Sequence, residues 1–141
     1  MPIREIAIAI ILDARGHYLF QRRDNIPGIA HPGKVSLFGG HREAGETYLE
    51  CVVREVQEEI GYSVMPNGVE YLTSLDEAGD IVDGDPVHGE VYVLRDVPSD
   101  DLAVTEGSLM IVDPGRLAEL EPEFTPATRF AIGAFLSEFR R

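Results

Sequence analysis

The sequence has little positive charge, and this scarcity narrows the kinds of partner that the protein can bind. Its 141 residues include 12 lysines and arginines against 25 aspartates and glutamates, giving a formal net charge of −13 at pH 7. Nucleic-acid backbones and anionic membrane surfaces are bound by basic patches, so duplex nucleic acid and membranes are not expected partners. A small phosphorylated substrate stays compatible with this charge, because cations held by carboxylates can in turn hold phosphate oxygens.

Cysteine and long apolar runs are also scarce. Cys51 is the only cysteine, which excludes an intrachain disulfide, and we expect it to be a packed side chain rather than a nucleophile. The apolar run from Ile6 to Leu12 is too short to cross a bilayer and lacks a signal-peptide cleavage site. Length and a 44% hydrophobic content predict one soluble domain over residues 1–141, with a cytoplasmic location as the default.

What the sequence does contain is a helix with well-defined ends. Thr47 and Glu50 fit a capping box, which places the first helical residue at Tyr48, and Gly61 suits a left-handed C-terminal end. The apolar spacing predicts a single stripe facing the core, formed by Leu49, Val53, Val56 and Ile60.

Three glutamates of this helix, Glu55, Glu58 and Glu59, fall largely outside the apolar stripe. Residues three and four positions apart are neighbours on a helix surface, so Glu55 lies beside both others. Like charges at these spacings destabilise a helix by about 0.2–0.5 kcal/mol per pair. A divalent cation would compensate for this repulsion, since Mg²⁺ prefers carboxylate oxygens. The cluster by itself is equally compatible with a solvated acidic face.

Glycines surround the start of the helix and complete a longer motif. Gly39 and Gly40 predict a glycine loop ahead of the helix, because glycine permits backbone angles and close approaches that other residues resist. The segment Gly40–Tyr62 resembles the Nudix box, G-x5-E-x7-R-E-aliphatic-x-E-E-x-G-hydrophobic, and departs from it only at Tyr62, a packing position. The matching residues are Gly40, Glu46, Arg54, Glu55, Val56, Glu58, Glu59 and Gly61.

The resemblance implies a fold, an activity and a set of site residues. It implies the Nudix α/β/α sandwich with a mixed β-sheet, and a Mg²⁺- or Mn²⁺-dependent hydrolase acting on acid anhydrides in phosphorus-containing substrates. Glu58 and Glu59 would be the main metal ligands, joined by the main-chain carbonyl of Gly39. Glu55 would be a further ligand or the general base, and Arg54 would orient a glutamate. Water would attack one phosphorus of a nucleoside diphosphate linked to another group.

A further acidic residue downstream extends the resemblance. Glu106 lies between predicted strands and resembles the fourth carboxylate that Nudix hydrolases often place opposite the box helix, for metal binding or water activation. Asp100 and Asp101 are alternatives, and a solvated surface glutamate is the other interpretation.

Three residues near the glycines are candidates for substrate binding. Arg22 and Arg23 flank the loop ahead of the box, and arginine suits phosphate oxygens, although plain surface charge is the more common explanation for such residues. Phe38 could stack on a base or belong to the core. The four histidines are not spaced as metal ligands on any one helix.

The remaining segments predict a mixed sheet with helices on both faces. Asn25 to Lys34 reads as a loop, and Asp76 to Asp85 as a solvated or substrate-gating loop that does not fit a calcium-binding template. The expected strands are 3–12, 17–21, 35–38, 69–75, 87–94 and 109–112. We also expect a short helix at 114–120 and a longer helix that begins at Pro126. The residues of the longer helix expected to face inward are Ile132, Phe135, Leu136 and Phe139.

Three other functional classes remain open. A non-catalytic Nudix-like sensor would bind a nucleotide derivative, but binding alone needs neither Glu55 nor Arg54. A prenyl-diphosphate isomerase would need a catalytic cysteine in a loop, whereas Cys51 lies in the predicted helix. A structural protein with an acidic surface would have no specific metal affinity. The group attached to the diphosphate cannot be read from the sequence, and the resemblance also allows a homodimer.

Overall fold

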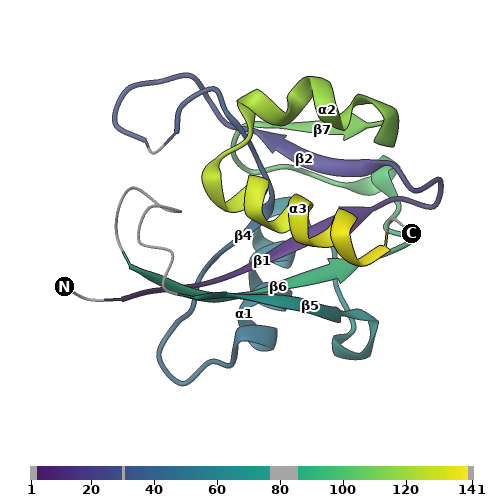
Figure 1. Ribbon diagram of the computed structural model, residues 1–141. Helices are drawn as coiled ribbons and strands as arrows, with labels where there is room; N and C mark the ends of the chain where they lie inside the picture. Colours follow the sequence, from purple (N-terminus) through teal and green to yellow (C-terminus); the bar gives the residue numbers. More distant parts are fainter. Residues whose placement is uncertain (1–2, 30, 77–85, 140–141) are drawn as a thin grey trace.

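Strand β1 lies at the centre of the sheet (Figure 1). The computed structural model describes residues 3–29, 31–76 and 86–139, and in it β1 spans Arg4–Leu12. On one side β1 pairs in parallel with β6 (Val87–Leu94). On its other side it pairs antiparallel with β4 (Phe38–His41) near its start and with β2 (Tyr18–Arg22) near its end. The sheet is therefore mixed, as the sequence predicted.

The other elements extend the sheet and cover it. Strands β3 (Val35–Ser36) and β7 (Ser108–Val112) pair with β2, and β5 (Glu70–Asp76) pairs with β6. The α-helices are α1 (Tyr48–Ile60), α2 (Leu117–Leu120) and α3 (Pro126–Phe139). Short 3-10 turns occupy Pro66–Gly68, Ser99–Asp101, Pro114–Arg116 and Glu121–Glu123. Among the described helices, none is long and apolar enough to serve as a membrane span.

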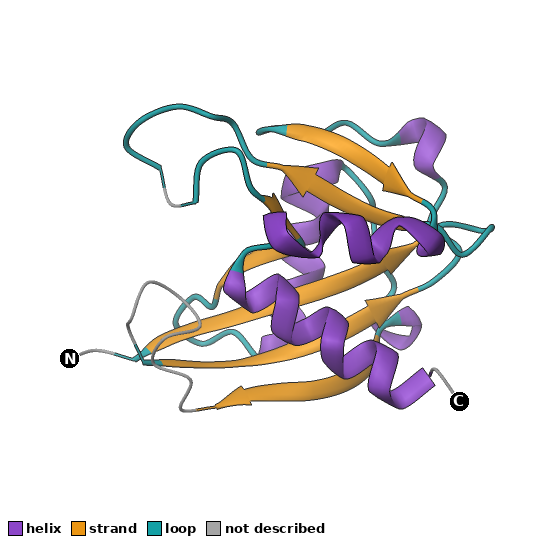
Figure 2. Cartoon of the chain, turned by 45° about the horizontal axis from the view of Figure 1, so that its top comes forward, coloured by secondary structure: helices purple, strands orange, loops and turns teal. Residues whose placement is uncertain are grey.

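Helices lie on both faces of the sheet because β1 carries apolar side chains on both of its own faces (Figure 2). Ala7 and Ala9 point to the face covered by α1, where their small side chains leave room for the helix. Ile8 and Ile10 point to the opposite face, where they pack in the same cluster as residues of α3. The α/β/α layering predicted from the sequence is confirmed.

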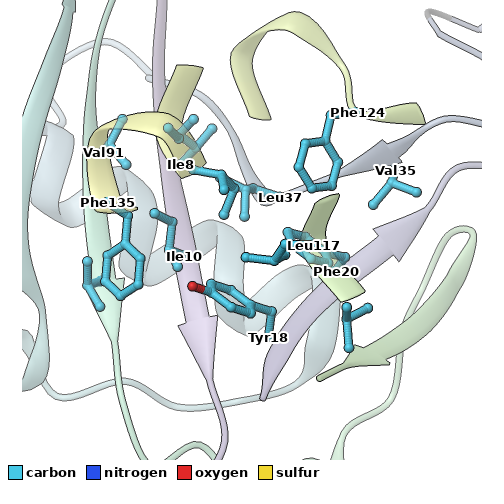
Figure 3. Packing of buried hydrophobic residues seen from close by; sticks show 14 of the residues in the cluster. Ile8, Ile10, Tyr18, Phe20, Val35, Leu37, Val91, Leu117, Phe124 and Phe135 are labelled. Atoms are coloured by element: carbon cyan, nitrogen blue, oxygen red, sulfur yellow. The ribbon is translucent and has the colours of Figure 1, made fainter. Parts of the chain in front are cut away.

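Aromatic rings bind the C-terminal part of the chain to the sheet (Figure 3). Tyr18 stacks on Phe20 with ring centroids 5.8 Å apart, and the edge of Phe135 meets Tyr18 at 6.0 Å. Phe124 lies 5.3 Å from Phe20. Ile132 and Phe135 of α3 are buried as predicted, whereas the side chain of Phe139 lies outside the described residues. This packing places α3 on the face of the sheet away from α1.

Most predicted elements are present, with one change next to the box. The segment predicted as a single strand at 35–38 forms two short strands, and the expected glycine loop is strand β4, which pairs Gly39 with Ile8 and Gly40 with Ala7. A Cβ on Gly39 would lie 2.2 Å from the Ala7 carbonyl oxygen, so only glycine allows this pairing. Of the predicted loop at 76–85, Asp76 ends β5 and residues 77–85 lie outside the described part.

Candidate active site

The two ends of α1 are fixed by the residues that the sequence indicated. The Thr47 hydroxyl accepts a hydrogen bond from the Glu50 N–H (3.0 Å), and the Glu50 carboxylate accepts one from the Thr47 N–H (2.8 Å). Gly61 ends the helix with a left-handed φ of 71°. Because both ends are set, the direction in which each glutamate of α1 points is also set.

The apolar stripe of α1 is rotated from its predicted position. Its fully buried residues are Cys51, Val52, Val56 and Ile60, whereas the predicted Leu49 and Val53 are only partly buried. Glu55 and Glu59 continue the Cys51 row at steps of four, so they lie at the edge of the core rather than away from it. Side-chain exposure is 16% for Glu55 and 59% for Glu58. The three glutamates therefore occupy different environments.

Strand β4 approaches the helix through its glycines. The Gly39 N–H donates a hydrogen bond to Oε1 of Glu59 at 2.7 Å. A Cβ on Gly40 would lie 2.5 Å from the carboxyl carbon of Glu55, so the absence of a side chain makes room for that carboxylate. The two glycines thus bring the backbone of β4 against two glutamates of the box.

Arg54 is the centre of the acidic cluster. Its guanidinium binds both oxygens of Glu46, with Nε 2.6 Å from Oε2 and Nη2 3.0 Å from Oε1. Its Nη1 also donates to Glu55 (2.8 Å) and to Glu58 (3.0 Å). The Arg54 guanidinium therefore offsets part of the repulsion between the glutamates, a role that the sequence suggested for a bound metal ion.

Glu46 ties the loop before α1 to the helix. Besides Arg54 it accepts a hydrogen bond from the Glu43 N–H at 2.9 Å. The hydrogen bond from Arg54, assisted by that from Glu43, lowers the pKa of Glu46 to about 2, and the carboxylates in turn raise the pKa of Arg54. This pair is therefore ionised throughout the physiological range.

Glu55 and Glu59 have the opposite electrostatic environment. Burial raises the pKa of both carboxyls. For Glu59 the pKa reaches about 7, because burial outweighs the Gly39 N–H hydrogen bond and the charges of Glu55 and Glu106 act in the same direction as burial. A carboxyl with a pKa near neutrality in a site is a typical feature of acid–base and metal centres.

Glu106 lies near the C-terminal end of α1. The Thr105 N–H donates to the Glu59 carbonyl and the Ala103 N–H to the Ile60 carbonyl, each at 3.0 Å. The charge of Glu106 contributes to the raised pKa of Glu59, after burial and the charge of Glu55. The alternatives Asp100 and Asp101 lie in the preceding 3-10 turn.

The three substrate-binding candidates have different surroundings. Arg22 donates to the Gly33 carbonyl (3.0 Å) and to Glu123 (2.6 Å), so its guanidinium holds the loop and the C-terminal segment together. Phe38 is fully buried in the core beside α1, which agrees with the core interpretation and leaves no ring face for stacking on a base. Arg23 lowers the pKa of Glu59, which places its charge near the glutamates.

A cavity of about 200 Å³ lies beside the Glu106 turn. Its lining residues are Gln21, Arg23, Asp24, Ile26, Ile29, Glu106 and Gly107. Gln21 and Asp24 belong to no recognisable motif, and the sequence offered no signal for them. A larger cavity of about 750 Å³ lies between α2, α3 and the sheet and is mainly apolar. Of these two cavities, the smaller is lined by Glu106 and lies on the turn that is hydrogen-bonded to the end of α1, so we assign the chemistry to that side of the molecule.

Cys51 and the histidines have structural surroundings. Cys51 is fully buried, and burial raises the pKa of its thiol to about 11, as expected for a packed side chain. His88 Nδ1 lies 2.7 Å from the Tyr48 hydroxyl, and His17 lies 3.5 Å from Asp113. The main-chain carbonyl of His41 accepts a hydrogen bond from Arg54 at 3.1 Å.

The protein has a mixed sheet between helices, and its strand β4 lies against a helix whose glutamates are bound by Arg54. These features define its structural class. The family model described as the NUDIX domain matches residues 2–133, and the chain belongs to the Nudix family. An uncharacterised Nudix hydrolase of Yersinia pestis is 40% identical over 58 residues, which are 40% of this chain and 31% of that protein. The chain therefore matches less than a third of that curated relative.

Solved structures share the fold at low sequence identity. A MutT protein from Methanosarcina mazei superposes with a TM-score of 0.76 at 23% identity, over 99% of this chain and 97% of that one. A bifunctional NMN adenylyltransferase/ADP ribose pyrophosphatase from Francisella tularensis, complexed with AMP and a manganese ion, has a TM-score of 0.73 at 16% identity, over 97% of this chain and 42% of that one. These likenesses support the sandwich fold.

Proposed function

We propose that the protein is a divalent-metal-dependent pyrophosphohydrolase, which cleaves a phosphoanhydride bond in a nucleoside diphosphate linked to another group. The observation that carries this proposal is the placement of Glu55 and Glu59, half-buried against the glycines of β4, with Glu55 bound by Arg54 and Glu59 by the Gly39 N–H. Membership of the Nudix family supports the same activity. The proposal treats the chain as one Nudix domain over residues 1–141.

The proposed cofactor is Mg²⁺ or Mn²⁺. Within residues 3–29, 31–76 and 86–139, no group of three or more aspartate, glutamate, histidine or cysteine side chains is arranged so that it could hold a metal ion. The donor chemistry nevertheless fits a hard cation, because each glutamate uses one oxygen in its described contact: Oε2 of Glu55, Oε1 of Glu58 and Oε1 of Glu59. The other oxygens, with the Gly39 carbonyl, would hold the cation, which supplies charge neutralisation and a more acidic bound water.

The chain's own residues have distinct proposed roles. Glu55 is a metal ligand or the general base, for which its raised pKa is suited. Arg54 orients Glu46, Glu55 and Glu58, and Glu106, on the turn hydrogen-bonded to the end of α1, is a second catalytic carboxylate. Arg23, beside the cavity at the Glu106 turn, would hold a phosphate of the substrate.

The proposed substrate is a small, nucleotide-derived diphosphate. The Francisella structure is described as an ADP ribose pyrophosphatase complexed with AMP and a manganese ion, which supports both a nucleotide substrate and a divalent cation here. The net charge of −13 favours a small ligand over duplex nucleic acid. A cytoplasmic location and a homodimer remain predictions of the same proposal.

A panel of diphosphate compounds with Mg²⁺ or Mn²⁺, scored for the bond that breaks, tests the activity. Glu58→Gln and Glu59→Gln should each lower kcat by about 100-fold or more while the fold persists. Glu119→Gln is the matched control, since Glu119 is an exposed glutamate that pairs with Arg116 three residues earlier. Full Mg²⁺-dependent activity in both variants would refute the ligand assignment. Tight binding of a nucleotide derivative without turnover would instead indicate a non-catalytic sensor.

A further inference from the structure

The turn that carries Glu106 is held by hydrogen bonds at three consecutive residues. One bond comes from the helix end, one from a buried side chain of β2, and one from the loop that follows β2. They join the Thr105 N–H to the Glu59 carbonyl (3.0 Å), Gln21 Nε2 to the Glu106 carbonyl (2.8 Å), and the Gly107 N–H to the Asp24 carboxylate (3.3 Å). The main chain on each side of the Glu106 side chain is therefore fixed.

Gln21 is a buried amide with a defined orientation. It is 6% exposed, and a buried polar group is costly unless it is hydrogen-bonded. A carbonyl only accepts hydrogen bonds, so the NH₂ group of Gln21 must face the Glu106 carbonyl. Its Oε1 accepts a hydrogen bond from the Ser36 hydroxyl at 3.3 Å. Both the NH₂ group and Oε1 of Gln21 are therefore hydrogen-bonded, and of the two it is the NH₂ group that binds the Glu106 turn.

The turn lies directly against the end of β2. Gly107 has a φ of +66°, and a Cβ there would lie 2.3 Å from the Arg22 carbonyl oxygen. Strand β7 begins immediately afterwards, with Ser108 opposite Arg22 and Leu109 opposite Gln21. This close approach is what allows the Gln21 side chain to reach the Glu106 main chain.

We propose that Gln21 and Asp24 are positioning residues, which hold the Glu106 turn against the end of α1 and thereby fix where the Glu106 carboxylate lies. The inference rests on the catalytic role proposed above for Glu106. Gln21 acts through the main chain of Glu106, and Asp24 acts through that of Gly107. Both also line the cavity of about 200 Å³ together with Arg23.

The first test compares Gln21→Met with Ser36→Ala. Methionine has nearly the shape of glutamine but no amide, whereas Ser36→Ala removes the other hydrogen bond of the same amide and leaves the turn untouched. With the best substrate of the diphosphate panel, Gln21→Met should lower kcat about tenfold or more with little change in KM. Ser36→Ala should stay within about twofold of the parent protein, and melting temperatures identify any general loss of stability.

A double-mutant cycle separates positioning from a merely structural role. If Gln21 acts through Glu106, Gln21→Met should cause no further loss of kcat in a Glu106→Gln background. Losses that multiply across the two sites would overturn the proposal, as would parent-like kcat in Gln21→Met.

Amide hydrogen exchange gives a readout that does not depend on activity. Asp24→Ala changes an exposed side chain, so folding is preserved even if Gln21→Met proves unstable. Both variants should speed exchange at the Thr105 and Gly107 amides about tenfold, with little change in β1. Unchanged exchange in either variant would overturn the proposed positioning. If the parent protein hydrolyses no compound of the panel, the proposed function fails, while the exchange rates still decide whether these side chains hold the turn.

Discussion

At the scale of single residues, Arg54 explains how the chain tolerates its acidic helix. The sequence presents three neighbouring glutamates, whose repulsion was compatible with either a compensating bound cation or a solvated acidic face. The structure shows a guanidinium shared among Glu46, Glu55 and Glu58, which lowers this repulsion within the protein itself. Glu59 does not share that contact and binds the Gly39 N–H instead. It is therefore the carboxylate whose ionisation is most costly.

This difference predicts a pH dependence of stability in metal-free buffer. The folded-state pKa of Glu59 is about 7, above its ordinary value of 4.5, so the folded state binds more protons between these values and stability falls as pH rises. The free energy of unfolding should decrease by up to about 3 kcal/mol across this window, and Glu59→Gln should remove the decrease. Urea unfolding at pH 5 to 8 with a chelator measures both. An identical pH slope in the two proteins would contradict the assignment.

The surroundings of several single residues could not be predicted from the sequence. The box identified Glu55, Glu58 and Glu59, but the environment of each depends on a rotation of the apolar stripe that spacing alone left undetermined. The sequence also left Phe38 either to stack on a base or to belong to the core, and its packing in the cluster with α1 decides for the core. The contact of Gln21 with the Glu106 turn could not be predicted, because the two residues are 85 positions apart in the chain.

At the scale of elements, the contact between β4 and α1 forms the site. The sequence predicted α1 well, because capping residues and a terminal glycine are local signals. It did not predict that Gly39 and Gly40 form a strand, since that strand exists through pairing with β1, some 30 residues earlier. The close approach of the β4 backbone to the carboxylates of α1 therefore depends on both elements.

The β4–α1 contact predicts a selective effect of a small substitution. A methyl group on Gly40 would meet the Glu55 carboxylate at 2.5 Å, and a flexible carboxylate can move away without unfolding the protein. Gly40→Ala should therefore lower kcat on the order of 100-fold with a small change in melting temperature. Gly68→Ala is the control, because a Cβ at Gly68 meets nothing within 4 Å. Equal activity of the two variants would show that Glu55 needs no fixed position.

At the scale of the whole molecule, acidity should make stability depend on divalent cations. A cation that binds only the folded state stabilises it by about 2.7 kcal/mol at 100 times its Kd, which corresponds to a rise of about 5–10 °C in melting temperature. Mg²⁺ and Mn²⁺ should produce this rise at constant ionic strength, and the double variant Glu55→Gln/Glu59→Gln should lose it. An equal rise with the same ionic strength of NaCl would indicate general screening of the −13 net charge instead.

The parallel pairing of β1 with β6 has a consequence for how the chain is made. Ile11 lies opposite Leu94, so β1 leaves the ribosome long before β6, its parallel neighbour, exists, although β2 and β4 follow sooner. At roughly 5–20 residues per second, this wait is on the order of ten seconds. During synthesis, the edge of the strand from Arg4 to Leu12 that later pairs with β6 is therefore an unpaired strand edge open to aggregation.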